Sequence, residues 1–261
     1  MKIYITTDFE GVACVVGQAG VPLGQGPQYE LAARMLTGEI NAAVEGALAA
    51  GATDIIVNDC HGSGLNLPYE QLHPEARILL GSPRPRRFLG LEGSAALFMV
   101  GYHSMAGTQN GILSHSYSSV GIQNMWLNDH QVGEIGLDAA LAGQLGVPVV
   151  LVTSDKAGAA EAHGIIGTTV RTVAVKEGIS RNAAISLSPA KAQALIRAAA
   201  EDAVRHISEV RPVIFEPPFR IRREYKLESL ADDAMRQHIP GMSRVDSRTV
   251  ERVSENLFDL I

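Results

Sequence analysis

The sequence predicts an α/β fold with a mostly parallel sheet, helices on both faces of that sheet, and a smaller C-terminal α+β lobe. Short, continuous apolar runs that suit central strands alternate with longer segments of helical character. Glycine follows several helical segments at the point where a helix would stop. After about residue 211 the charge density rises and prolines cluster at 212, 217 and 218. We therefore expect one domain over residues 1–261 with a possible lobe boundary near 211.

The elements follow in order along the chain. Residues 2–6 alternate apolar and polar side chains and are rich in β-branched residues, as strands are. A segment rich in Ala, Leu and Glu ends at Gly51, and Ser188 with Pro189 marks the start of a later helix. The predicted strands span 2–6, 54–57, 96–101 and 147–152, and the predicted helices span 29–50, 132–145 and 189–206.

Composition argues against nucleic acid as the main partner. The chain of 261 residues has 22 Lys and Arg against 28 Asp and Glu, a formal charge of −6, whereas nucleic-acid domains are usually basic. The only dense basic run, Arg84, Arg86 and Arg87, is broken by prolines, and we expect it to be a solvated loop. The hydrophobic fraction of 46% with 19% charged residues is typical of a globular enzyme.

The sequence also indicates a cytoplasmic protein with no membrane partner. No apolar stretch reaches the ~18 residues of a membrane helix. Acidic residues come too early in the first ten residues for the apolar region of a signal peptide. The two cysteines, Cys14 and Cys60, are too few for a disulfide framework.

Carboxylates and imidazoles follow three of the predicted strands. Asp8 and Glu10 end the first strand, and in an extended chain they would project on the same side. Two carboxylates that close repel each other unless a cation or a proton lies between them. His61 follows the second apolar strand, and His103 follows the third. Glu134 lies at the start of the next predicted helix.

Each of these residues alone also has an ordinary structural explanation, such as a solvated acid, a loop histidine or a Glu that complements a helix dipole. Together they predict a metal site, because the carboxyl ends of strands in such a sheet meet at one crevice. Imidazole and carboxylate suit zinc, and five ligands exceed the needs of one tetrahedral ion. Asp8 has two oxygens and could bridge two ions. His115, between two serines in a β-like stretch, is left over for acid–base or nucleophilic chemistry.

These motifs resemble the zinc-dependent D-aminopeptidase family of the DppA type. The shared segments fall in order over roughly the first 200 residues, and the last ~60 match less clearly: DFEG at 8–11, NDCHG at 58–62, GYH at 101–103, LSHS at 113–116, NDHQVGEIGL at 128–137, VPVVLVTSD at 147–155, AVKEGISR at 174–181 and LSPAKA at 187–192. Thr6, Cys60 and the Ser154-Asp155-Lys156 segment depart from the family pattern, and none is a proposed ligand.

The resemblance implies a zinc metalloprotease that removes N-terminal D-amino acids from short peptides and assembles as a ring-shaped homodecamer. It implies two Zn²⁺ per protomer, with His115 as the catalytic residue and with these metal ligands: Asp8 as the bridging carboxylate, Glu10, His61, His103 and Glu134. His115 would either attack the scissile carbonyl itself, or carry a proton or stabilise the oxyanion while water attacks.

Other functions stay open from the residues alone. One alternative is another two-metal amidohydrolase or a phosphatase, for which Gly62-Ser63-Gly64 is a faint candidate phosphate loop, although no P-loop pattern exists. A second alternative is a non-catalytic peptide-binding protein on the same fold. The simplest alternative is an α/β protein whose histidines are only structural. Cys60 as a nucleophile would need a partnered base, and the neighbouring histidines are better used as ligands.

Overall fold

A seven-stranded sheet forms the centre of the computed structural model, which describes residues 1–261. Its order is β3-β2-β1-β4-β7-β8-β9, and all neighbouring pairs are parallel except β8 and β9. The strands are β1 (Lys2–Thr7), β2 (Asp54–Asp59), β3 (Ala76–Leu79), β4 (Ala96–Val100), β7 (Val149–Asp155), β8 (Arg171–Ser180) and β9 (Ala183–Ser186).

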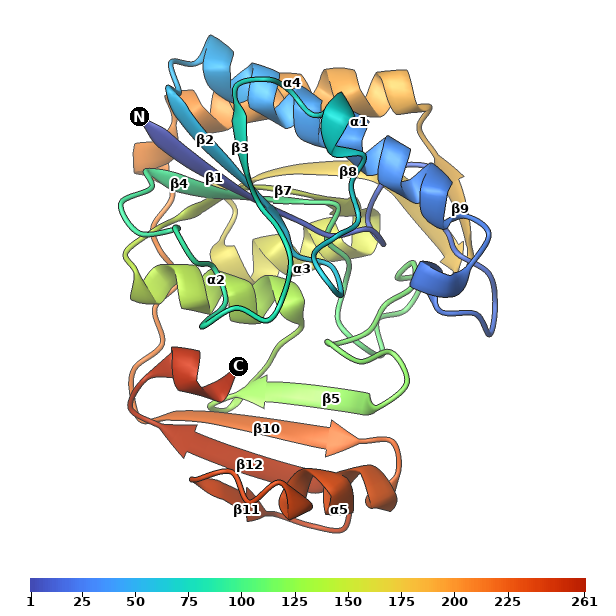
Figure 1. The fold of residues 1–261 in the computed structure, drawn as a ribbon, viewed down its shortest axis with the longest axis vertical. Coiled ribbons are helices and arrows are strands. Elements are labelled where there is room, and N and C mark those ends of the chain that lie inside the picture. The colour runs from blue at the N-terminus through green and yellow to red at the C-terminus, as the bar shows by residue number, and fades with distance from the viewer.

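Helices cover both faces of this sheet. Figure 1 shows α1 (Tyr29–Ala49) and α4 (Pro189–Arg205) together on one face. It shows α2 (Glu134–Gln144) and α3 (Lys156–Ile166) on the opposite face. The predicted α/β fold with a mostly parallel sheet is therefore confirmed.

A second sheet lies beyond α2 and forms the smaller lobe (Figure 1). It is antiparallel, with the order β11-β12-β10-β5-β6. Its strands are β5 (Ile122–Leu127), β6 (His130–Gln131), β10 (Phe219–Tyr225), β11 (Met242–Arg244) and β12 (Thr249–Ser254), and α5 (Glu228–Arg236) packs against three of them. The lobe thus takes β5 and β6 from the middle of the chain in addition to its C-terminal strands.

The strand order reverses direction between β1 and β4. From β1 the chain adds β2 and β3 on one side, whereas β4, β7 and β8 extend the sheet on the other side. Ligand sites in open α/β sheets form at such a switch point, outside the carboxyl ends of the strands. Asp8, Glu10 and His103 follow the carboxyl ends of β1 and β4, so they lie at this point.

Apolar side chains bury both faces of the central strands. In β1, Ile3 and Ile5 pack in the cluster that includes Leu36 of α1. Tyr4 points to the other face and packs in the cluster that includes Leu141 of α2. Burial on both faces explains why the predicted central strands are continuous apolar runs.

The predicted elements match observed ones, with small shifts at their ends. The strand predicted over 147–152 is β7, which runs three residues further, and the helix predicted over 132–145 is α2, which begins at Glu134. Gly51 follows α1 with φ +94°, as expected of a helix stop. Ser188 is the N-cap residue of α4, although its side chain makes no capping hydrogen bond. None of the helices is both long enough and apolar enough to cross a bilayer.

Candidate metal centre

Asp8 and Glu10 follow β1 in a tight turn. β1 ends at Thr7, and the Phe9 amide donates a hydrogen bond to Asp8 Oδ1 at 3.0 Å. The expectation of an extended chain through residues 8–10 is therefore wrong, because the strand ends at Thr7 and the chain bends at Phe9. Gly11 lies against Tyr102, where an added Cβ would be 1.8 Å from the carbonyl oxygen. This close approach brings the turn after β1 against the residues that follow β4.

His61 and His103 come from the ends of β2 and β4, as expected. His61 Nε2 lies 3.6 Å from Glu10 Oε1. His103 is buried, and its Nε2 lies 3.3 Å from Asp8 Oδ2. His103 Nδ1 is 3.0 Å from the Ser104 carbonyl oxygen. When Nδ1–H donates to this carbonyl, Nε2 is the ring nitrogen that faces the carboxylates, as in many metal-binding histidines.

Glu134 and His115 complete the cluster from the side of α2. Glu134 is the first residue of α2, and its Oε1 lies 3.4 Å from His103 Nε2 and 3.6 Å from His115 Nε2. The imidazoles of His103 and His115 stack with their centroids 4.1 Å apart. His115 lies in a loop and not in the predicted β-like stretch, since Ser114 and Ser116 pair with no strand. The structure thus brings all six predicted site residues together.

Several potential metal-ligating atoms in this cluster are buried without a hydrogen-bond partner. They are Asp8 Oδ2, Glu10 Oε2, His61 Nδ1 and His103 Nε2. Ligand atoms of Asp8, Glu10 and His103 lie within 4.8 Å of one another, and so do those of His103, His115 and Glu134. Unpartnered buried polar atoms are uncommon in proteins and each needs an explanation. A divalent cation would satisfy these atoms and neutralise the carboxylates, so the donor set fits zinc.

Inside the cluster, the carboxylates and the histidines shift one another's pKa values. Burial, with the nearby charge of Glu10, raises the pKa of Asp8 to about 7. Burial would by itself raise the pKa of Glu134, but the neighbouring His103 outweighs burial and lowers this pKa to about 2. In the same way burial opposes a charge on His61, yet the adjacent Glu10 raises the pKa of His61 to about 9. Protons on the histidines therefore balance the carboxylates wherever no metal does so.

Two cavities open onto His115 from different sides. The first, of about 310 Å³, also reaches Asp8, His61 and Glu134 and has Tyr102 and Tyr117 in its walls. The second, of about 190 Å³, also reaches Glu10 and is lined by Leu23, Leu113, Val120, Arg181 and Asn182 among others. A ligand at the cluster can therefore extend in two directions.

Arg87 forms part of the wall of the first cavity and is paired with Asp138. Arg87 donates from Nε and Nη2 to the two carboxylate oxygens of Asp138, each at 2.7 Å. Tyr102 Oη donates to Asp138 Oδ2 at 2.6 Å. The Asp138 side chain is fully buried, and only 20% of that of Arg87 is exposed. The prediction that Arg84, Arg86 and Arg87 form a solvated loop is therefore wrong for Arg87, whose partner comes from the distant helix α2, and for Arg84, which is half-buried and donates to Asn58 and Asp59.

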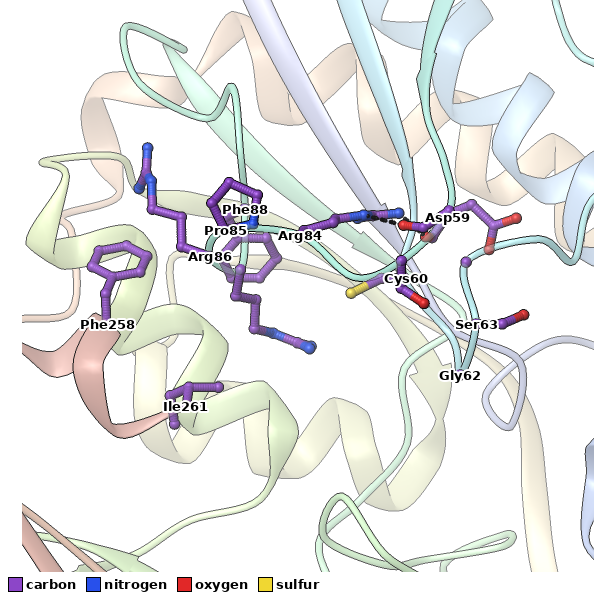
Figure 2. A pocket seen from close by; sticks show the side chains of 14 residues that line it. Asp59, Cys60, Gly62, Ser63, Arg84, Pro85, Arg86, Phe88, Phe258 and Ile261 are labelled. Carbon is purple, nitrogen blue, oxygen red and sulfur yellow. Dashed lines mark hydrogen bonds between the residues drawn. The ribbon is translucent and has the colours of Figure 1, made fainter. Parts of the chain in front are cut away.

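A third pocket, of about 300 Å³, adjoins the first cavity at Cys60, Gly62 and Arg87. Figure 2 shows Arg84 in this pocket, directed at the Asp59 carbonyl oxygen, to which its Nη2 donates at 2.9 Å. The Gly62-Ser63-Gly64 loop lines the pocket, but the next helical segment begins only at Tyr69. The faint candidate phosphate loop therefore leads into no helix N-terminus.

Two residues near the cluster, Cys60 and Lys176, are not among the predicted ligands or catalytic residues. Burial raises the pKa of the Cys60 thiol, which disfavours the thiolate that a nucleophile or ligand would need. The Lys176 ammonium is buried and donates to the carbonyl oxygens of Glu10 and Val12 at 2.6 Å each, and to that of Val15. Lys176 therefore holds the loop that carries two carboxylates. In the sequence, Lys176 is a charged residue within a predicted family-like segment, AVKEGISR at 174–181.

Known proteins resemble this chain over most of its length. The profile of the peptidase M55 family, described as D-aminopeptidase, matches residues 1–261 and so includes the last 60 residues. A curated D-aminopeptidase from Bacillus subtilis (strain 168) is 39% identical over 223 residues, which is 84% of this chain and 79% of that protein. A solved structure, described as the Zn-dependent D-aminopeptidase DppA from Bacillus subtilis, a self-compartmentalizing protease, matches with a TM-score of 0.92 and 33% identity. That match covers 99% of this chain and 93% of the DppA chain.

Proposed function

The chain belongs to the peptidase M55 family of D-aminopeptidases, and from this premise we propose that it is a zinc-dependent peptidase that removes N-terminal D-amino acids from short peptides. The solved relative is described as Zn-dependent, which supports zinc as the metal. The observation that carries the proposal is the buried cluster of Asp8, Glu10 and His103, whose ligand atoms converge without hydrogen-bond partners.

We propose that the site holds two zinc ions per protomer. Asp8, Glu10, His61, His103 and Glu134 would be the ligands, with Asp8 between the two ions. Ligand atoms of Asp8, Glu10 and His103 form one group, and those of His103 and Glu134 lie with His115 in a second, which supports a centre larger than one ion. The bound ions would supply Lewis acidity that polarises the scissile carbonyl.

His115 would be the catalytic residue. Its Nδ1 lies 2.8 Å from the Leu113 carbonyl oxygen, so Nε2 faces the cluster and both cavities. Burial, with the nearby His103, lowers the pKa of His115, which keeps the imidazole neutral and able to accept a proton or attack a carbonyl. Trapping an acyl-imidazole in a single turnover would identify direct attack.

We further propose that the chain assembles as a ring-shaped homodecamer. The support is the family resemblance together with the solved relative, which is described as self-compartmentalizing. A cytoplasmic location also stays a prediction, based on two free cysteines.

Metal content tests the proposed centre. We expect about two zinc equivalents per protomer in the wild type after gentle purification, and one or fewer in His61→Ala. His163→Ala, which removes an exposed histidine on α3, is the matched control and should keep both ions. A wild type that holds no zinc even when zinc is supplied would refute the proposal.

Assays with the zinc-loaded enzyme test the reaction. We expect hydrolysis of D-alanyl dipeptides, slower hydrolysis of the L-isomers, and no hydrolysis of phosphoesters. Phosphoester cleavage without peptide cleavage would favour the phosphatase alternative. Peptide binding without turnover would favour the non-catalytic alternative.

A further inference from the structure

The second cavity at His115 is built from three segments that are far apart in the sequence. The first follows β1 and supplies Glu10 and Leu23. The second is the loop of His115, which supplies Leu113, His115 and Val120. The third is the tight turn between β8 and β9, at residues 181–182. This cavity therefore joins the metal cluster to a turn at the edge of the sheet.

Hydrogen bonds fix the turn between β8 and β9 beside the catalytic loop. The Leu113 amide donates to the Arg181 carbonyl oxygen at 2.9 Å. Arg181 Nη1 donates to the carbonyl oxygen of Ser114, the residue before His115. Asn182 Nδ2 donates to the Val16 carbonyl oxygen at 2.8 Å. The Arg181 guanidinium is thus held one residue from His115 in the same cavity.

The Arg181 side chain forms no ion pair and donates a single hydrogen bond, whereas the other arginines near the site are paired or donate several. Arg87 is paired with Asp138, and Arg86 is paired with Glu92. Arg84 donates to Asn58 Oδ1 at 2.5 Å and to the Asp59 carbonyl oxygen, the second of which is drawn in Figure 2. Arg181 bonds only one carbonyl oxygen, so its Nε and Nη2 are available to a ligand. Arg181 is therefore the cationic residue with free hydrogen-bond donors in this cavity, and Glu10 is the acidic residue that lines it.

We propose that Arg181 binds the C-terminal carboxylate of the peptide substrate and so makes the enzyme selective for short peptides with a free C-terminus. The proposal rests on the function proposed above. A short peptide carries an amine at one end and a carboxylate at the other. The carboxylates and metal of the centre suit the amine end, whereas a carboxylate there would meet Asp8, Glu10 and Glu134. Arg181 provides the complementary charge on the leaving-group side, with donors that match a carboxylate.

The test compares one peptide with a free C-terminal carboxylate and the same peptide as its C-terminal amide. We expect wild-type kcat/KM to be about 10- to 100-fold higher for D-alanyl-glycine than for D-alanyl-glycinamide, because the charge-assisted hydrogen bonds are lost in the amide. Arg181→Met should lower kcat/KM for the acid by this factor and leave the value for the amide nearly unchanged. Arg181→Lys should restore part of the preference. Arg86→Met, in the neighbouring pocket of Figure 2, is the matched control and should keep the wild-type ratio.

Binding without turnover provides a second readout. The probes are D-alanyl-glycine analogues in which a methylene-amine replaces the scissile amide, prepared as the acid and as the amide. Titration calorimetry should show tighter binding of the acid to the wild type and equal binding of both probes to Arg181→Met.

Three outcomes would overturn the proposal. The first is equal wild-type kcat/KM for the acid and the amide, and the second is an equal loss of kcat/KM for both peptides in Arg181→Met. The third is loss of the preference for the acid in Arg86→Met. Equal losses would mean that Arg181 only positions the His115 loop. In all three cases D-dipeptides are still cleaved and the proposed function stands. If the zinc-loaded wild type cleaves neither peptide, the proposed function fails and this inference fails with it.

Discussion

His103 and His115 are stacked neighbours with the same backbone interaction, yet their surroundings differ. Each ring has Nδ1 beside a backbone carbonyl oxygen, so Nε2 faces the carboxylates in both. His103 is only 1% exposed and lies between Asp8 and Glu134. His115 contacts Glu134 alone among the carboxylates and borders both cavities. Burial among carboxylates suits His103 as a ligand, whereas the position of His115 at the cavities suits contact with substrate.

His115→Ala should therefore lower kcat and leave the metal in place. A general acid–base group typically contributes ~10²–10⁴-fold to the rate, and we expect a loss in that range. Zinc content and kcat should be measured on the same preparation, with His163→Ala as the control. Loss of zinc from His115→Ala would contradict this division of roles.

Glu39 is a buried carboxylate whose ionisation opposes folding. It lies on α1, where its Oε1 accepts a hydrogen bond from the Ala13 amide at 2.8 Å while Oε2 has no partner. Burial raises the pKa of Glu39 from 4.5 to about 7. Between these pH values the folded chain keeps a proton that the unfolded chain has lost. Stability therefore falls as pH rises through this window.

Glu39→Gln removes this titration and keeps the acceptor for Ala13. The free energy of unfolding of the variant relative to wild type should rise from pH 5 to about pH 7 and then level off, with a total gain of up to about 3 kcal/mol. Denaturant unfolding at several pH values measures this difference in the free energy of unfolding. Glu45→Gln, an exposed position on the same helix, should show little change. A difference that does not vary with pH would argue against the raised pKa.

At the scale of elements, parallel strands bring side chains to one edge, but loops determine the final geometry. β1, β2 and β4 each end in a turn that carries a proposed ligand. The turn after β1 is held from β8, through the Lys176 ammonium and the carbonyl oxygens of residues 10, 12 and 15. β8 therefore supports the site without supplying a ligand.

Lys176→Met should weaken zinc binding while the fold is retained. Outer partners of metal ligands typically contribute 10–100-fold to metal affinity, and we expect a loss of that size. Competition with a chelator measures zinc affinity, and thermal unfolding in parallel reports on the fold. Lys156→Met, which removes an exposed lysine on α3, is the control. Unchanged zinc affinity in Lys176→Met would show that the loop keeps its position without the ammonium.

At the scale of the whole molecule, a second, antiparallel sheet extends the central fold. This chain covers 93% of the solved relative at a TM-score of 0.92, so it has nearly all the elements of a protein described as self-compartmentalizing. We therefore expect mass photometry to show one main particle of ten 27.8-kDa chains. A fully active monomer would contradict the proposed ring.

Much of the fold and the grouping of the site residues could be predicted from local patterns. Apolar runs such as 96–101 identify central strands because both faces of such a strand are buried. Residues that follow parallel strands meet at one edge, which is why Asp8, His61 and His103 could be grouped without a structure. The turn at Asp8–Glu10 and the loop around His115 could not be predicted, because contacts with other loops determine their shapes.

The sequence by itself determined the α/β class and the central strands, which follow from periodicity, and the meeting of Asp8, Glu10, His61 and His103 at the switch point, which follows from strand direction. Only the tertiary structure decided that Arg87 is paired with Asp138, that Lys176 holds the loop of Glu10, and that Arg181 lies unpaired beside the His115 loop. It also decided that β5 and β6 join the C-terminal strands. These contacts join residues 50 to 170 positions apart, and no local pattern encodes which distant side chains packing will bring together.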